Sequence, residues 1–133
     1  MVLEDVAGLV SAAFGLLALG AVMLYVRNST ASGALGRNDV IGIRTKVTKS
    51  SDLAWRVGHR AAGPWLLAAT WIGFVGGSLT ICAGVAGAVS DVRGPALLVV
   101  PAAGFLGVAS TGLIAGKKAN EAGRSAADEL ESR

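Results

Sequence analysis

The stretch AAGPWLLAATWIGFVGGSLTICAGVAGAVS, residues 61–90, contains no Asp, Glu, Lys, Arg or His. A hydrocarbon layer ~30 Å thick is crossed by ~20 apolar residues in a helix, so this stretch is long enough to span a membrane. Two further windows, residues 6–26 and 94–116, are equally free of charge. The sequence therefore predicts an all-α membrane protein with three transmembrane helices, at about residues 6–26, 61–84 and 96–116.

The composition of the whole chain agrees with this class. Hydrophobic residues make up 53% and charged residues 16% of the 133 positions, against ~25% charged residues in soluble domains. A soluble all-α domain would need polar residues on the outer face of every helix, and the pattern does not supply them. The first window follows Glu4 and Asp5, whereas a signal peptide starts with positive charge, so we interpret it as a retained helix.

The basic residues gather on one side of the predicted spans. The loop 27–60 and the tail 117–133 hold eleven of the twelve Lys and Arg residues, and the short turn 90–95 holds only Arg93. Cytoplasmic loops carry the excess of Lys and Arg in membrane proteins. The sequence thus predicts one membrane domain with an outside N-terminus and an inside C-terminus. Its Ala, Gly, Val and Arg content suggests a bacterial gene, and we expect a multi-pass protein of the inner (plasma) membrane.

The loop 27–60 carries seven basic and two acidic residues, a net charge of +5. Such a cluster is attracted to anionic lipid headgroups, at ~1 kcal/mol per basic residue near the surface. Nucleic acid would suit the same charge, but a loop held against a membrane argues against it. We expect anionic lipids as partners, together with another membrane protein or a second copy of the chain, and no nucleic acid.

Several kinds of chemistry are disfavoured by what the sequence lacks. Proton-coupled transporters need an ionisable group inside the membrane, and the predicted spans contain none. The single histidine, His59, and the single cysteine, Cys82, offer no metal-ligand spacing. Ser51 and His59 do not form a recognisable nucleophile arrangement. We therefore expect no enzyme activity, no catalytic residue, no cofactor and no metal.

Local signals predict that the loop is folded. Gly42 interrupts a short apolar cluster, which favours a tight turn and either unusual backbone freedom or close approach to another element. Residues 50–52 (SSD) predict a helix start, because their side-chain oxygens can accept bonds from the free N–H groups. Trp55 and His59 then fall on one face of that helix. Residues 29–36 are predicted to be a flexible connection.

Two features at and beyond the spans leave alternatives open. The pairs Gly73–Gly77 and Gly112–Gly116 have the G-x-x-x-G spacing that lets helix backbones approach closely. They predict packing among the protein's own helices, which we favour, or a homodimer seam. The tail 117–133 is highly charged, and is either a frayed continuation of the third helix or disordered.

The segment NDVIGIRT, Asn38–Thr45, followed by Thr48, Trp55, His59 and Gly63, resembles the SdpI family of small bacterial membrane proteins. The resemblance covers roughly residues 15–80. One departure is Lys46, where the family commonly has proline after the Arg-Thr pair. The family name implies immunity to a sporulation-delaying peptide toxin, exerted by binding at the membrane.

The residues of this motif have two interpretations, and the sequence favours both equally. They form a binding site for lipid headgroups or a protein, or they only fold a surface hairpin that packs under the helices. Trp55 is expected to anchor its helix at headgroup depth, and Thr45 with Thr48 to brace the turn. The candidate binding residues are Arg37, Asn38, Ile41, Gly42, Ile43, Arg44, Thr45, Thr48, Trp55 and His59.

These observations support two functional hypotheses of different classes. The first is a non-enzymatic SdpI-like protein that gives toxin immunity or envelope protection. The second is an accessory subunit that packs beside a larger membrane transport or envelope complex, which the shortness of the chain favours. Lipid handling by the basic loop is a weaker third option.

Overall fold

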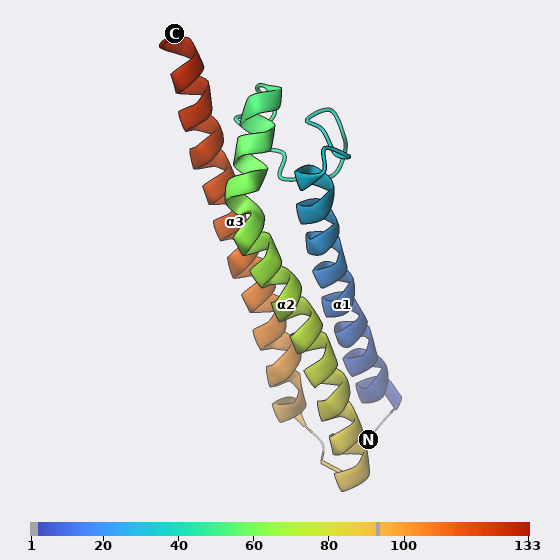
Figure 1. The fold of residues 1–133 in the computed structure, drawn as a ribbon. Helices are drawn as coiled ribbons and strands as arrows, with labels where there is room; N and C mark the ends of the chain where they lie inside the picture. Colours follow the sequence, from blue (N-terminus) through green and yellow to red (C-terminus); the bar gives the residue numbers. More distant parts are fainter. Residues whose placement is uncertain (1–2, 93) are drawn as a thin grey trace. The chain divides into compact units, whose positions relative to one another are not determined.

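The computed structural model describes residues 3–92 and 94–133, where the chain forms three α-helices and no β-strand (Figure 1). Each α-helix is long and apolar enough to cross a membrane. This confirms the predicted all-α architecture with three candidate spans. The elements are α1 (Leu3–Ala31), α2 (Asp52–Ser90), the short 3-10 helix η1 (Pro95–Leu98) and α3 (Val99–Glu131).

The helices extend beyond the charge-free windows. α2 has 39 residues and α3 has 33, both more than the ~20 needed to span. α2 starts at Asp52 and continues through Pro64. α3 includes almost the whole charged tail, so of the two alternatives for residues 117–133 the helical continuation is correct. Arg93, the one basic residue assigned to the outer turn, lies outside the described residues.

The chain divides into two compact units. The first contains the described part of Met1–Val22 and Ala69–Ala109. Here α1 and α2 meet through glycine: a Cβ placed on Gly73 would lie 2.7 Å from the carbonyl oxygen of Leu16 and 2.9 Å from the Cα of Gly20. A Cβ on Gly77 would lie 2.7 Å from Leu17 Cγ. The Gly73–Gly77 pair thus packs α2 against α1 of the same chain.

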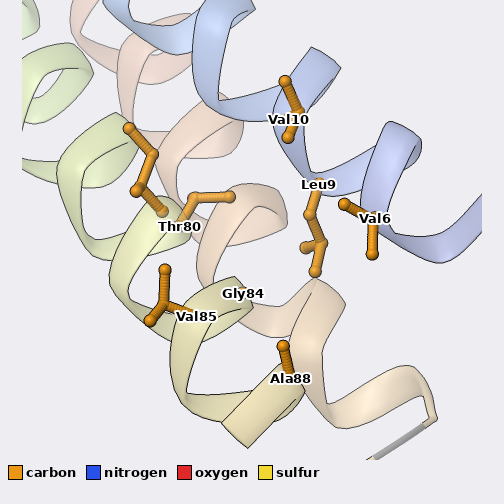
Figure 2. Close-up of a pocket in the computed structure, with 8 residues that line it drawn as sticks. Val6, Leu9, Val10, Thr80, Gly84, Val85 and Ala88 are labelled. Atoms are coloured by element: carbon orange, nitrogen blue, oxygen red, sulfur yellow. The ribbon is translucent and has the colours of Figure 1, made fainter. Parts of the chain in front are cut away.

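An apolar cavity of about 190 Å³ also lies in the first unit (Figure 2). Among the described residues of its wall, the one hydroxyl belongs to Thr80, which donates to the carbonyl oxygen of Gly76 at 2.7 Å. These residues therefore offer no free polar side chain. It is lined by Val6, Leu9, Val10, Thr80, Ile81, Gly84, Val85 and Ala88.

The second unit contains Met23–Ala68 and Ser110–Arg133. Its core is built from the C-terminal part of α1, the N-terminal part of α2 and the C-terminal part of α3. Small residues allow close packing here: a Cβ on Gly58 would lie 2.8 Å from the carbonyl oxygen of Ala119. The buried core residues are Val26, Ala62, Leu66, Ala115 and Ala119, with Met23, Ile43 and Trp65 packed against them.

The Gly112–Gly116 pair does not share this close packing. Within the part of the chain that the structure describes, nothing lies within 4 Å of a Cβ built on Gly116, and only the Met23 Cε, at 3.9 Å, is near one built on Gly112. The contact face of α3 is carried by Ala115 and Ala119 instead. In the second unit, no close helix contact therefore supports the packing role predicted for Gly112–Gly116.

Candidate functional site

The segment of residues 32–51, here called the motif loop, connects α1 to α2 within the second unit. α1 continues through Thr30, whose hydroxyl donates to the carbonyl oxygen of Val26 at 2.6 Å. The helix then ends with Gly33 at φ +82, a left-handed conformation that commonly terminates helices. The amide of Leu35 donates back to the carbonyl oxygen of Ser29 at 3.0 Å. Residues 29–36, predicted to be flexible, are thus partly helical and hydrogen-bonded.

The other end of the motif loop is fixed by the start of α2. The hydroxyl oxygen of Ser51 accepts a hydrogen bond from the amide of Ala54 at 3.0 Å, and α2 begins at Asp52. This is the N-cap arrangement that satisfies a free amide of the first turn. The helix start predicted from residues 50–52 is confirmed.

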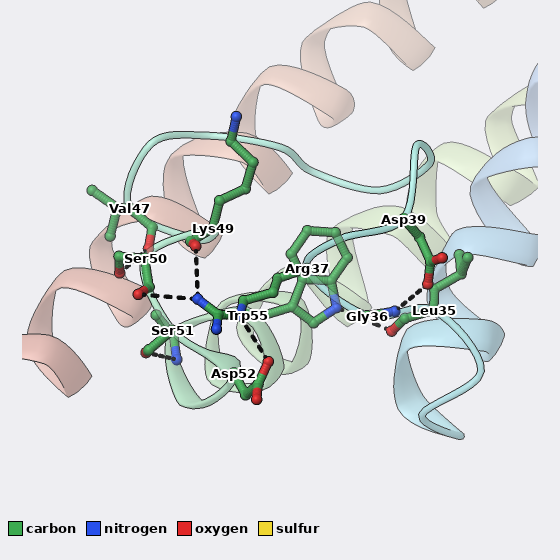
Figure 3. Close-up of polar contacts among 11 residues, drawn as sticks. Leu35, Gly36, Arg37, Asp39, Val47, Lys49, Ser50, Ser51, Asp52 and Trp55 are labelled. Atoms are coloured by element: carbon green, nitrogen blue, oxygen red, sulfur yellow. Dashed lines mark hydrogen bonds and ion pairs between the residues drawn. The ribbon is translucent and has the colours of Figure 1, made fainter.

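Arg37 ties the beginning of the motif loop to its end (Figure 3). Its Nε lies 3.0 Å from the Oδ1 of Asp52. Its Nη1 donates to the carbonyl oxygens of Lys49 and Ser50, both at 3.4 Å. The ion pair is partly exposed and contributes modestly, but the guanidinium is already engaged within the loop.

The turn that follows is closed by an acidic side chain. The Oδ2 of Asp39 accepts a hydrogen bond from the amide of Gly36 at 2.6 Å (Figure 3). A short side chain such as that of Asp39, hydrogen-bonded to the nearby backbone, is the usual way to stabilise such a turn. The neighbouring Asn38 is exposed, and its side chain forms no hydrogen bond within the described residues.

Two threonines brace the middle of the motif loop, as the sequence predicts. The fully buried Thr48 accepts from the amide of Thr45 at 2.9 Å and donates to the carbonyl oxygen of Ile43 at 2.7 Å. The hydroxyl of Thr45 also donates to the Oδ1 of Asn120 at 2.9 Å. Because Asn120 belongs to α3, this bond joins the motif loop to the tail helix.

Asn120, like Asp39, is a residue of this site that the sequence interpretation missed. It lies in the charged tail, beside the buried Ala119 and three residues before the buried Gly123. A Cβ on Gly123 would lie 3.2 Å from the Val47 side chain of the motif loop. The spacing of small residues along the tail was the available signal, because it marks a narrow buried face on a helix.

Trp55 and His59 form the support beneath the motif loop. Their ring centroids are 4.1 Å apart, and the side chains are only 2% and 3% exposed. The indole N–H of Trp55 donates to the carbonyl oxygen of Leu35 at 3.1 Å (Figure 3). The expected headgroup anchor is therefore not what Trp55 provides, because its ring is covered by the loop.

Both nitrogens of the His59 ring are hydrogen-bonded. Nε2 accepts from the amide of Ile43 at 2.9 Å, and Nδ1 lies 2.8 Å from the carbonyl oxygen of Trp55. A carbonyl can only accept, so Nδ1 carries the hydrogen and the ring is neutral. Protonation of Nε2 would place an N–H against the N–H of Ile43. The neutral ring is thus part of the loop fold.

Gly42 completes the support by allowing the loop backbone to touch these rings. Its φ is +132, in the region that favours glycine. A Cβ at this position would lie 2.6 Å from the Cη2 of Trp55 and 3.2 Å from the Nε2 of His59. Both predicted roles of Gly42, unusual backbone freedom and close approach, are confirmed.

The outer surface of the motif loop is basic and apolar. Val40 is 88% and Ile41 46% exposed, and Arg44, Lys46 and Lys49 are exposed as well. The candidate residues therefore separate into two groups. The residues that build the loop are Gly42, Thr45, Thr48, Trp55 and His59, together with Arg37 and Ile43, whereas Asn38, Ile41 and Arg44 are exposed.

Burial lowers the pKa of His59 below its ordinary value of 6.5, and the hydrogen bond to the Trp55 carbonyl opposes this shift. His59 precedes the charge-free window 61–90, and its sequence neighbours Arg56 and Arg60 are cations. Burial of an imidazole disfavours its charged form. The folded loop therefore prefers neutral His59.

We expect acidification to loosen the motif loop. Above the unfolded pKa of 6.5 both states hold neutral His59, and its full contribution to the free energy of unfolding is present. As the pH falls below this value, the unfolded loop takes up a proton that the folded loop resists, so stability decreases until the lowered folded pKa is passed. Hydrogen exchange of residues 42–51 at about pH 7.5 and about pH 5 measures this.

His59→Asn is the control for this experiment, because His59 is the only histidine. The variant should exchange faster at both pH values and lose the pH dependence after correction for the intrinsic exchange rate. An unchanged pH dependence in the variant would contradict the assignment to His59.

The fold and the loop together define a class: a small multi-pass α-helical membrane protein with a hydrogen-bonded polar loop between its first two helices. The SdpI/YfhL protein family matches residues 34–115, which include most of the motif loop and all of α2. This match covers more than half of the chain, and the chain belongs to this family. No significant match was found among curated proteins or among solved structures.

Proposed function

We propose that this chain is a non-enzymatic membrane protein that protects the bacterial envelope, as in immunity to a membrane-active peptide, by binding at the inner membrane. The observation that carries the proposal is the engagement of His59, whose two ring nitrogens hold the Ile43 amide and the Trp55 carbonyl. A general base must reach a substrate proton, and this ring faces the loop backbone instead. Binding by a prefolded loop is the function that such a design supports.

The exposed part of the motif loop supports this proposal. Arg44, Lys46 and Lys49 are exposed, next to Val40, which is 88% exposed. Basic side chains beside an apolar one suit an anionic membrane surface or an amphipathic peptide lying on it. The proposal includes a cytoplasmic position for this loop, as the distribution of Lys and Arg favours.

Expression in a host that lacks related genes tests the proposal. We expect the wild-type chain to raise the inhibitory concentration of at least one member of a panel of membrane-active peptides several-fold. The Arg44→Gln/Lys46→Gln/Lys49→Gln variant should lose most of this protection, whereas Lys117→Gln/Lys118→Gln, which removes exposed charges from α3, should retain it. A wild-type protein that is present in the membrane and protects against none of the peptides would contradict the proposal.

A second candidate is an accessory subunit of a larger membrane complex. Trp71 lies in the middle of the second span, and its side chain is 62% exposed. Tryptophan is enriched at membrane interfaces rather than at the centre, so a partner helix would suit this position. Purification in mild detergent tests it: a large membrane protein in equal amounts, lost in the Trp71→Ala variant, would favour the subunit role over envelope protection.

A further inference from the structure

A hollow of about 670 Å³, here called the arginine hollow, lies in the second unit where α1 ends and α2 begins. It is separate from the outer surface of the motif loop that carries Arg44 and Lys46. Its walls come from the last turn of α1, the residues just after it and the first turns of α2. The lining residues are Arg27, Thr30, Ala31, Ser32, Gly33, Arg56, His59, Arg60, Gly63, Pro64 and Leu67.

The charge of the arginine hollow has one sign. Arg27, Arg56 and Arg60 line it, and none of the described residues in its wall is Asp or Glu. Within the described residues Arg56 and Arg60 form no ion pair and no side-chain hydrogen bond, and Arg27 forms one, from Nη1 to the Oδ1 of Asn28 at 3.0 Å. Arg37, by contrast, is engaged with Asp52. The guanidinium donors of the hollow are thus largely available.

Arginine is well suited to phosphate. Its planar guanidinium presents five N–H donors and binds phosphate oxygens in forked pairs. Arg56 and Arg60 are four residues apart on α2, which places them on one face of the helix. Arg27 comes from α1, so the three donors reach the hollow from two helices.

The walls change character along α2. Arg56 and Arg60 precede the charge-free window 61–90, whereas Pro64 and Leu67 lie within it. The hollow is therefore basic at one end and apolar at the other. A ligand with a phosphate and an adjoining hydrocarbon part matches both ends, and this is the construction of a phospholipid.

We propose that the arginine hollow binds a phosphate-bearing headgroup, with Arg27, Arg56 and Arg60 as the phosphate ligands. The proposal deepens the binding at the membrane described above by naming a site and its ligand chemistry. It rests on the membrane position of the chain and not on immunity. A protein that gives no protection against peptides would still bind phosphate here.

Thermal unfolding of the purified full-length chain tests the site. The protein is measured in nanodiscs of phosphatidylcholine, in nanodiscs that also contain phosphatidylglycerol, and in phosphatidylcholine with added inorganic phosphate. We expect phosphatidylglycerol to raise the Tm and the Arg56→Gln/Arg60→Gln variant to lose most of that rise. In a lipid titration, the affinity of this variant for phosphatidylglycerol should fall about tenfold or more, because each charge-assisted hydrogen bond that is lost contributes strongly to binding.

Lys117→Gln/Lys118→Gln is the matched control, since it removes two exposed charges from α3 and leaves the hollow intact. It should keep the phosphatidylglycerol effect. Stabilisation by inorganic phosphate alone, lost in Arg56→Gln/Arg60→Gln, would identify a free phosphate as the ligand of the same site. An equal loss in both variants would mean general surface attraction and would overturn the proposal, as would no stabilisation by either source of phosphate.

Discussion

Replacing Gly42 with alanine is expected to release the motif loop while the three helices remain. The new Cβ would lie 2.6 Å from the Cη2 of Trp55, and the backbone would keep a φ of +132 that an L side chain rarely adopts. A strained backbone conformation costs ~1–3 kcal/mol, and overpacking costs a further ~1–3 kcal/mol. The buried Trp55 ring cannot move aside without breaking its hydrogen bond to the carbonyl oxygen of Leu35.

Hydrogen exchange of residues 36–51 measures this effect, with far-UV circular dichroism as a check that the helices persist. Two other loop glycines separate the causes. Gly33 has a φ of +82, but none of the residues at 3–92 and 94–133 lies within 4 Å of its Cβ position. Among the same residues, a Cβ on Gly36 would meet only the Asp39 Oδ2, at 3.8 Å. Gly33→Ala should cost only the backbone strain of ~1–2 kcal/mol, and Gly36→Ala should be near neutral. If Gly42→Ala exchanged as slowly as the wild type, the contact of Gly42 with the Trp55 and His59 rings would not be what holds the loop.

The three spans could be predicted from the sequence because lipid demands long windows without charge, and windows such as 61–90 are unmistakable. The ends of the helices could not be predicted in the same way. They are set by local bonds, such as the Ser51 cap and the left-handed Gly33, and not by the membrane boundary. Charged segments beyond the spans therefore stay helical. The charge of the tail hid the narrow buried face at Ala119.

The motif loop was predictable in its parts but not in its arrangement. Spacing alone places Trp55 and His59 on one face of a helix, and composition alone makes Gly42 a turn. The hydrogen bond from the Ile43 amide to the His59 ring depends on where the loop returns to the helix. No local sequence pattern encodes that position. The structure shows the folding role for part of this motif: buried members such as Thr48 hold the loop. Arg44 is exposed, and its binding of a partner stays a prediction.

Replacing Gly73 with alanine is expected to force α1 and α2 apart in the first unit. The added Cβ would lie 2.7 Å from the carbonyl oxygen of Leu16 and 2.9 Å from both the Cα and the amide nitrogen of Gly20. All three are backbone atoms, so no rotamer change can relieve the contact. Overpacking of a tight core costs ~1–3 kcal/mol, and we expect the upper end because only a shift of a whole helix provides room. Thermal unfolding of the detergent-purified protein measures the loss.

Gly116→Ala is the matched control, because Gly116 belongs to the other G-x-x-x-G pair and no atom of the described residues lies within 4 Å of its Cβ position. Its Tm should stay near that of the wild type. Size-exclusion chromatography with each melt separates the two roles that such motifs serve. If Gly73→Ala dissociated a dimer without lowering the Tm of the monomer, the pair would be a seam between copies of the chain. A Tm lowered equally by both substitutions would mean that close backbone approach at Gly73 is not the cause. The expected result, a lower Tm for Gly73→Ala alone and no change of oligomeric state, assigns the stability of the α1–α2 contact to one missing side chain.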